Sequence, residues 1–174
     1  MANSFRSFVF KMRFNKRAIA AVPHEEQLER IHRYLGTLGQ LHPLLGKWYL
    51  QGASVQDALS NDVLSAPQAL SEAAAASFDA EYPTWLSVAV WNGQEDPLQG
   101  GLAFSYDAHD MESISSMDFE DAGALVSALE NPRPVLVEML RLAVSIWPEI
   151  DWGVVAPGRY YLDGQTFSDR QTIG

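Results

Sequence analysis

Between residues 84 and 119 the sequence alternates apolar and polar side chains in three successive runs, a pattern that few folds can accommodate. The first run ends at Asn92-Gly93, a dipeptide typical of turns, and the second ends in the polar loop around His109. A period of two is that of a β-strand with one buried face. The pattern predicts an antiparallel meander of three strands, whose alternating sets are Leu86, Val88 and Val90, then Leu102, Phe104 and Tyr106, then Ser113, Ser115, Met117 and Phe119.

The segments around this meander mix further strands with helices. Alternation over residues 8–14 predicts a first strand, and Lys16 and Arg17 extend its basic outer face. Apolar residues spaced three and four apart predict long helices after Pro23 and after Pro132. The shorter predicted elements are a strand at 44–52, helices at 55–59, 67–80 and 122–129, and strands at 151–156 and 160–162.

Two of the shorter helices carry more specific expectations. The alanine-rich helix at 67–80 has high intrinsic propensity, with Leu70 and Phe78 on its weakly apolar side, and Asp121 is the expected cap of the helix at 122–129. Because strands and helices do not alternate regularly, the sequence predicts an α+β fold. We expect one domain over residues 1–174, with a central antiparallel β-sheet and helices packed on it.

Residues 48–132 contain no lysine or arginine, although acidic side chains recur throughout them. Apolar residues such as Trp85, Val88 and Phe104 are interleaved with these acids, which distinguishes the stretch from a disordered acidic tail. A folded surface with one sign of charge repels itself but projects a strong field into solvent. Two interpretations stay open: a docking surface for a basic partner, or a surface that only promotes solubility.

The overall charge excludes some classes of function. A net charge of -10 argues against a protein that grips nucleic-acid phosphates, because that function needs a basic face. The chain has no cysteine and hence no disulfide or thiolate chemistry. Residues 1–14 lack the features of a signal peptide, and no apolar run approaches the roughly 20 residues of a membrane span. We therefore expect a cytoplasmic protein that contacts neither nucleic acid nor membrane directly.

No recognisable catalytic set occurs in the sequence. Glycine-rich phosphate loops, G-x-S-x-G and H-E-x-x-H are absent. The best candidate for a metal site is Asp107, His109 and Asp110, which would support a metal-dependent hydrolase, but the EF-hand spacing and glycine are missing. An ordinary polar loop is the favoured interpretation. We predict a protein that is not an enzyme and has no cofactor.

A binding role agrees better with the pattern. The acids of 95–121 occupy turns, strand faces and loop ends of the predicted meander, so we expect them on one side of a sheet. Trp85 and Trp91 point to the face opposite Val88, where they either anchor an interface or pack beneath a helix. Such a surface would complement a basic groove. The candidate binding residues are Trp91, Glu95, Asp96, Asp107, Asp110, Glu112, Asp118, Glu120 and Asp121.

Three parts of the chain resemble the immunity protein 52 family. They are Leu45-Gly46-Lys47-Trp48-Tyr49-Leu50-Gln51-Gly52-Ala53-Ser54 with Asp57-Ala58-Leu59, then Val88-Ala89-Val90-Trp91-Asn92-Gly93, and Asp151-Trp152-Gly153 through Asp169-Arg170-Gln171-Thr172-Ile173-Gly174. The resemblance implies a cytoplasmic antidote that neutralises a toxin encoded beside it, typically a nuclease of restriction-endonuclease fold delivered by an interbacterial secretion system such as type VI secretion. It also implies a further strand after Ile173-Gly174, so we expect a shortened form.

Charge and resemblance together favour an immunity protein that inhibits a nuclease toxin stoichiometrically. It would cover the basic active groove of the toxin or a surface that the toxin needs for assembly. The alternative is a non-catalytic adaptor or chaperone that loads a secreted effector and leaves it active.

Overall fold

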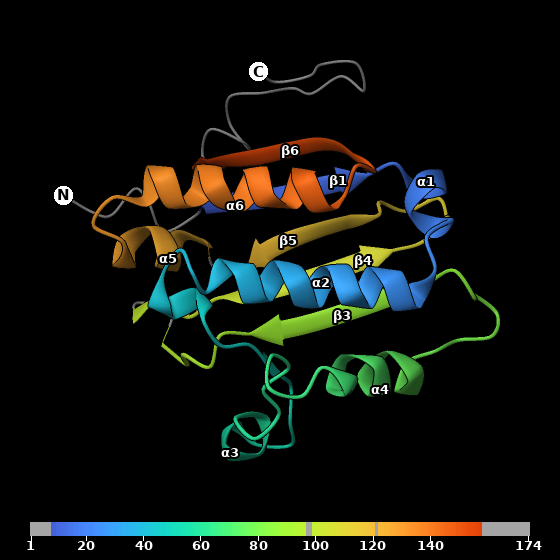
Figure 1. The fold of residues 1–174 in the computed structure, drawn as a ribbon, viewed down its shortest axis with the longest axis horizontal. Coiled ribbons are helices and arrows are strands. Elements are labelled where there is room, and N and C mark those ends of the chain that lie inside the picture. The colour runs from blue at the N-terminus through green and yellow to red at the C-terminus, as the bar shows by residue number, and fades with distance from the viewer. Residues whose placement is uncertain (1–7, 97–98, 121, 158–174) are drawn as a thin grey trace.

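The computed structural model describes residues 8–96, 99–120 and 122–157, and in these residues the chain forms a six-stranded antiparallel sheet with helices (Figure 1). The strand order is β2-β3-β4-β5-β1-β6. This arrangement confirms the predicted α+β class with a central antiparallel sheet. Along the chain the elements are β1 (Phe8–Phe14), α1 (Lys16–Ala20), α2 (His24–Leu38), the 3-10 helix η1 (Pro43–Leu45), β2 (Tyr49–Leu50), α3 (Val55–Ala58), α4 (Gln68–Ala76), β3 (Leu86–Trp91), β4 (Ala103–Ala108), β5 (Ser116–Glu120), α5 (Ala122–Ala128), α6 (Pro132–Ile146) and β6 (Ile150–Pro157).

The predicted meander is confirmed as β3, β4 and β5. Phe104 lies opposite Val90 on one side and Phe119 on the other, and Phe119 also lies opposite Phe10 of β1. The ring centroids of Phe104 and Phe119 are 5.2 Å apart, and those of Phe10 and Phe119 are 5.0 Å apart. Aromatic pairs at such distances add to the stabilisation from burial. This row of buried side chains ties the first strand to the meander.

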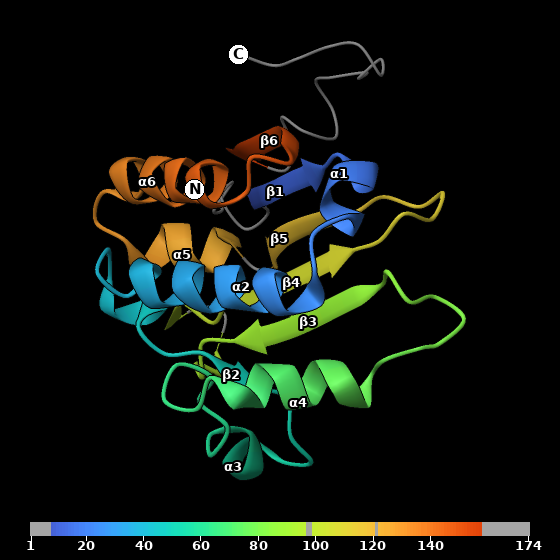
Figure 2. The same ribbon diagram turned by 45° about the vertical axis from the view of Figure 1, so that its right-hand side comes forward.

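Helices α2, α5 and α6 lie on the face of the sheet that carries these rings (Figures 1 and 2). Helix α2 buries a stripe of residues at spacings of three and four, as the sequence predicts. Its Tyr34 is fully buried and donates a hydrogen bond to the Met139 carbonyl of α6 over 3.0 Å. Burial raises the pKa of the Tyr34 hydroxyl, because the tyrosinate would lose its hydration.

One buried glutamine joins α2 to the sheet. The Gln27 amide nitrogen donates to the carbonyls of Ile19 and Val22, at 3.2 and 2.7 Å. Its amide oxygen accepts a hydrogen bond from the Tyr106 hydroxyl over 2.7 Å. All these polar groups are thus paired, which removes most of the cost of burying them.

Several local predictions are wrong. Lys16 and Arg17 do not extend the first strand; they belong to α1, which begins after Asn15 because the Asn15 side chain accepts a hydrogen bond from the Ala18 N–H. Phe78 is 54% exposed, since α4 ends at Ala76 and only Leu70 reaches the core. The predicted strand at 44–52 is the 3-10 helix η1 followed by the two-residue strand β2. The predicted strand at 160–162 and the cap Asp121 lie outside the described residues.

The opposite face of the sheet, called the open face below, carries no helix across it in the described part of the chain (Figure 2). It presents small, polar and charged side chains, with α3 at the β2 edge. Trp85 and Trp91 therefore do not pack beneath a helix formed by the described residues. Within the described ranges no helix has both the length and the apolar character needed to cross a membrane. The residues of the open face used below are Trp91 of β3, Ala103, Ser105 and Asp107 of β4, Ser116, Asp118 and Glu120 of β5, and Lys11 of β1.

Candidate functional site

Three of the predicted acids and one tryptophan share the open face. Asp107 lies opposite Ser116, Asp118 opposite Ser105, and Glu120 opposite Ala103. Asp118 and Glu120 lie on β5, whereas Asp107 lies on β4 towards the other end of the pairing. Trp91 is on β3, where it lies opposite Ala103. The expected display on one side of the sheet thus holds for Asp107, Asp118, Glu120 and Trp91.

The remaining candidates lie in loops at opposite ends of the meander. Asp110 and Glu112 belong to the β4–β5 loop, whereas Glu95 and Asp96 belong to the β3–β4 loop. The six residues of β4 separate the two loops by about 20 Å. These acids therefore do not form one cluster, and Asp121 lies outside the described residues.

The acids of the open face differ in whether their carboxylates already have a partner in this chain. Asp118 accepts a hydrogen bond from the Ser105 hydroxyl over 2.9 Å and lies 3.6 Å from the Lys11 ammonium. Asp107 accepts from the Trp85 indole N–H over 2.6 Å. Glu120 is exposed and has no partner among the described residues. Among the acids of this face, Glu120 is the one whose carboxylate has no hydrogen-bond or ion-pair partner in the described residues.

The loop suggested for metal binding has a different geometry from a metal site. His109 is buried, and its Nε2 lies 3.8 Å from Asp107 and 3.3 Å from the Ser113 hydroxyl. The Asp110 carboxylate accepts a hydrogen bond from the Thr84 hydroxyl over 2.7 Å. No group of three or more His, Asp or Glu side chains in the described residues is arranged to hold a metal ion. The loop contacts instead tie the start of β3 to the end of β4.

A hollow of about 370 Å³ opens at the corner where α3 meets the open face, and we call it the corner hollow. Trp91 lies in its wall, and Tyr49 packs against that ring with centroids 6.1 Å apart. Glu120 is the charged side chain in its lining. The residues that line it are Gln51, Gly52, Ser54, Val55, Ala58, Ala89, Val90, Trp91, Ala103, Phe104, Ser105 and Glu120.

Two glycines let the backbone fit tightly around this corner. Gly93 has φ +79°, and a Cβ there would lie 2.6 Å from the Tyr49 ring. A Cβ on Gly52 would lie 2.5 Å from the Ala58 nitrogen of α3. Glycine is therefore required at both positions, one beside the ring that supports Trp91 and one beneath α3.

Polar and aromatic side chains hold the same corner from within. The Asn92 amide donates to the carbonyls of Leu44 and Gly100, at 3.1 and 2.8 Å, and its oxygen accepts from the Leu102 N–H. Trp48 is fully buried, and its indole N–H donates to the Leu45 carbonyl over 2.9 Å. The sequence identified these segments by resemblance and Asn92-Gly93 as a turn, but it gave no signal that they meet in space.

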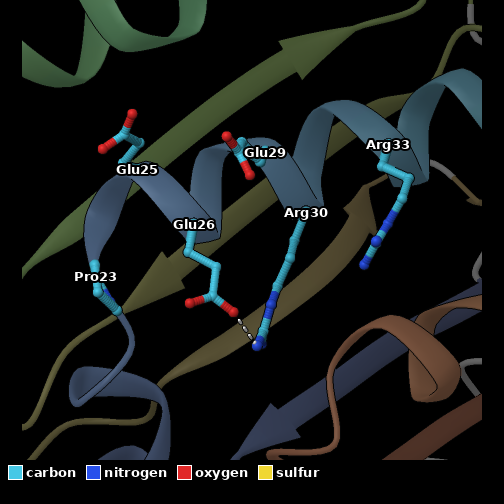
Figure 3. A pocket seen from close by; sticks show the side chains of 6 residues that line it. All are labelled: Pro23, Glu25, Glu26, Glu29, Arg30 and Arg33. Atoms are coloured by element: carbon cyan, nitrogen blue, oxygen red, sulfur yellow. Dashed lines mark hydrogen bonds and ion pairs between the residues drawn. The ribbon is translucent and has the colours of Figure 1, made fainter.

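A second hollow of about 640 Å³ lies along the outer side of α2 (Figure 3). It is lined by Pro23, Glu25, Glu26, Glu29, Arg30 and Arg33.

Arg30 of this hollow is already engaged within the chain. It forms ion pairs with Glu26 at 2.7 Å and with Glu149 at 2.9 Å. Burial opposes its charge, but the hydrogen bonds to Glu149 and Glu26 outweigh that effect and raise the pKa of the guanidinium. These ion pairs link α2 to the turn before β6. We therefore assign the charged side chains of this hollow a stabilising role and do not treat it as a candidate site.

Comparison with known proteins identifies one family. The family model described as Immunity protein 52 matches residues 19–173, which is most of the chain. No curated protein matches the sequence.

Proposed function

This chain belongs to the immunity protein 52 family, and from that premise we propose that it neutralises a nuclease toxin by stoichiometric binding through the open face. Family membership makes the chain an immunity protein whose partner is a toxin. The class of the toxin and the surface that binds it are the proposed parts. The mechanism is inhibition by contact, in which the bound chain covers a basic surface that the toxin needs.

The observation that carries this proposal is the electrostatic character of the open face. Asp107, Asp118 and Glu120 come from a stretch of sequence without lysine or arginine. The bases on this face come from β1: Lys11 lies 3.6 Å from Asp118, and exposed Arg13 lies opposite Ser116. No helix of the described residues crosses this face. Among the described residues Glu120 is exposed, and Asp107, Asp118 and Trp91 are half-buried. A nuclease must present a basic groove to bind phosphates, and complementary potentials speed encounter and orient the partners.

The test is titration of the toxin encoded by the neighbouring gene. Purified chain is mixed with the toxin at increasing molar ratio, and cleavage of DNA and of RNA is measured at low and high salt. We expect inhibition to be complete near equimolar ratio and association to slow as salt rises. Undiminished nuclease activity in a stable complex would contradict inhibition and favour an adaptor that loads an active effector.

A matched pair of charge variants locates the surface. Asp118→Asn with Glu120→Gln removes two negative charges from the open face. Glu25→Gln with Glu29→Gln removes two exposed charges from α2, which lies on the other side of the sheet. We expect the first pair to slow association on the order of tenfold and the second to leave it nearly unchanged. Equal effects would show that only net charge matters.

A further inference from the structure

We propose that the corner hollow is a socket for a single arginine side chain of the toxin. This inference rests on the proposed function and names the chemistry of one contact within it. The open face carries the three components that such a socket needs: a flat aromatic ring, a carboxylate that no described residue pairs, and a small residue between them.

The three components lie in one row across the sheet. Trp91 of β3 lies opposite Ala103 of β4, and Ala103 lies opposite Glu120 of β5. Neighbouring strands are about 4.8 Å apart, so the ring and the carboxylate originate about 10 Å from each other. The methyl group of Ala103 leaves the space between them free, and this space belongs to the corner hollow. A planar guanidinium fits above Ala103 with one face on the indole and its edge towards Glu120.

The aromatic wall of the socket is held in place before any partner arrives. Tyr49 continues the same row beyond Trp91, and their ring planes are inclined at 51° with centroids 6.1 Å apart. Gly93 in turn packs directly against the Tyr49 ring. A side chain that is ordered in advance loses little conformational entropy on binding.

In the neighbouring row of the sheet, an equivalent carboxylate is paired with a cation. There Ser105 lies opposite Asp118, and Asp118 lies opposite Lys11, whose ammonium is 3.6 Å from the carboxylate. This chain thus supplies a cation to Asp118 but supplies none to Glu120 from its described residues. A cation from the partner would complete the second row in the same way.

Arginine fits this site better than lysine does. Its guanidinium stacks on indole faces and can bond a carboxylate through two parallel N–H groups. Lysine carries a compact, strongly hydrated ammonium, which has no planar group to stack on the indole while it bonds the carboxylate. The lining combines the Trp91 ring with one carboxylate, and it includes no lysine or arginine to repel the incoming charge.

The decisive experiment measures affinity of the intact chain for the toxin encoded beside it. Ala103→Leu fills the hollow without a change in charge, and Glu120→Gln removes the carboxylate. Ser87→Leu is the matched control, since Ser87 is an exposed position on the open face of β3 that does not line the hollow. We expect Ala103→Leu and Glu120→Gln each to weaken binding about tenfold or more, with Ser87→Leu close to wild type. Denaturant unfolding of each variant confirms that it is folded.

Each arginine of the toxin is then replaced by lysine and by alanine. For one toxin arginine, replacement by lysine should weaken binding about as much as Glu120→Gln does. Combining these two variants should weaken binding no further than either one alone, which identifies the interacting pair. The socket is overturned if wild type binds but Ala103→Leu and Glu120→Gln bind equally well, or if no toxin arginine couples to Glu120. A wild-type chain that neither binds nor inhibits the toxin would instead overturn the proposed function itself.

Discussion

The two faces of the sheet come from the same strands, yet they differ in almost every physical respect. On the covered face, Phe104 and Phe119 are buried beneath α2 and pack ring against ring. On the open face, the adjacent residues Ser105 and Asp118 form a hydrogen bond at the surface. One β-strand can contribute to a buried apolar face and to an exposed polar face, because its successive side chains point to opposite sides of the sheet.

This difference separates what stabilises the molecule from what is free to recognise a partner. The covered face contributes apolar burial, the main favourable term in folding. The open face buries less apolar surface, so we expect substitutions there to change stability less. The predictions below measure how complete that separation is.

The largest effect is expected from the covered face. Phe104→Ala removes a fully buried ring that contacts Tyr34, Trp48 and Phe119, and it should lower the free energy of unfolding by about 3–5 kcal/mol. Urea denaturation followed by tryptophan fluorescence measures this loss. Ser87→Ala on the open face is the control and should change stability by less than about 0.5 kcal/mol. Similar losses for both variants would contradict the separation.

A smaller loss is expected at the corner that supports Trp91. Gly93→Ala places a methyl group against Tyr49 at φ +79°, so the free energy of unfolding should fall by about 1–3 kcal/mol. Gly36→Ala is the control, because Gly36 lies within α2 and its nearest contact would be 3.9 Å away. That variant should be stabilised by about 0.5–1 kcal/mol. A tolerated Gly93→Ala would show that the corner is not rigid, which would weaken the argument for an ordered socket.

The buried tyrosines should make the fold sensitive to alkali. Burial raises the pKa of the Tyr34 and Tyr106 hydroxyls above the ordinary tyrosine value of 10.0. Above pH 10 the unfolded chain therefore loses these two hydroxyl protons while the folded chain retains them. Stability from this source is complete below pH 10 and declines as pH rises, by about 1.4 kcal/mol per tyrosine at pH 11. Tyr34→Phe should flatten the decline between pH 9 and pH 11 in denaturant titrations. An unchanged slope in that variant would mean that Tyr34 ionises without unfolding.

The smallest effect on stability is expected at Glu120. Glu120→Gln removes an exposed carboxylate without a partner in the described residues, so the free energy of unfolding should stay within about 0.5 kcal/mol of wild type. The same variant is expected to weaken toxin binding, which is the clearest expression of the contrast between the faces. A large loss of stability would place Glu120 among the structural residues.

Much of the fold was predictable because hydrophobic periodicity survives in the sequence. The alternation over 84–119 predicted β3, β4 and β5, and the stripes after Pro23 and Pro132 predicted α2 and α6. The errors fall where periodicity gives little information. The short helix α1 depends on one cap at Asn15, and Phe78 lies just past the end of α4, where helix propensity says nothing about burial.

The candidate site was predictable only in part. The list of acids in 95–121 included Glu120 and Asp118, but it also included loop acids at both ends of the meander. Nothing in one sequence distinguishes Asp118, which Lys11 pairs, from Glu120, which has no such partner in the described residues. The charge pattern therefore indicated a kind of surface without its geometry. The boundaries of a single domain over 1–174 stay a prediction.

The sequence by itself determined which side chains avoid water and which remain charged, because alternation and helical spacing are local properties of the chain. It thereby determined the strands of the meander, the long helices and an acidic stretch over residues 48–132 without lysine or arginine. Only the tertiary structure decided that Tyr49, Trp91, Ala103 and Glu120 form one row across four strands. The physical reason is register: it depends on hydrogen bonds between strands and on glycines such as Gly93 at their ends, and these join residues far apart in the sequence.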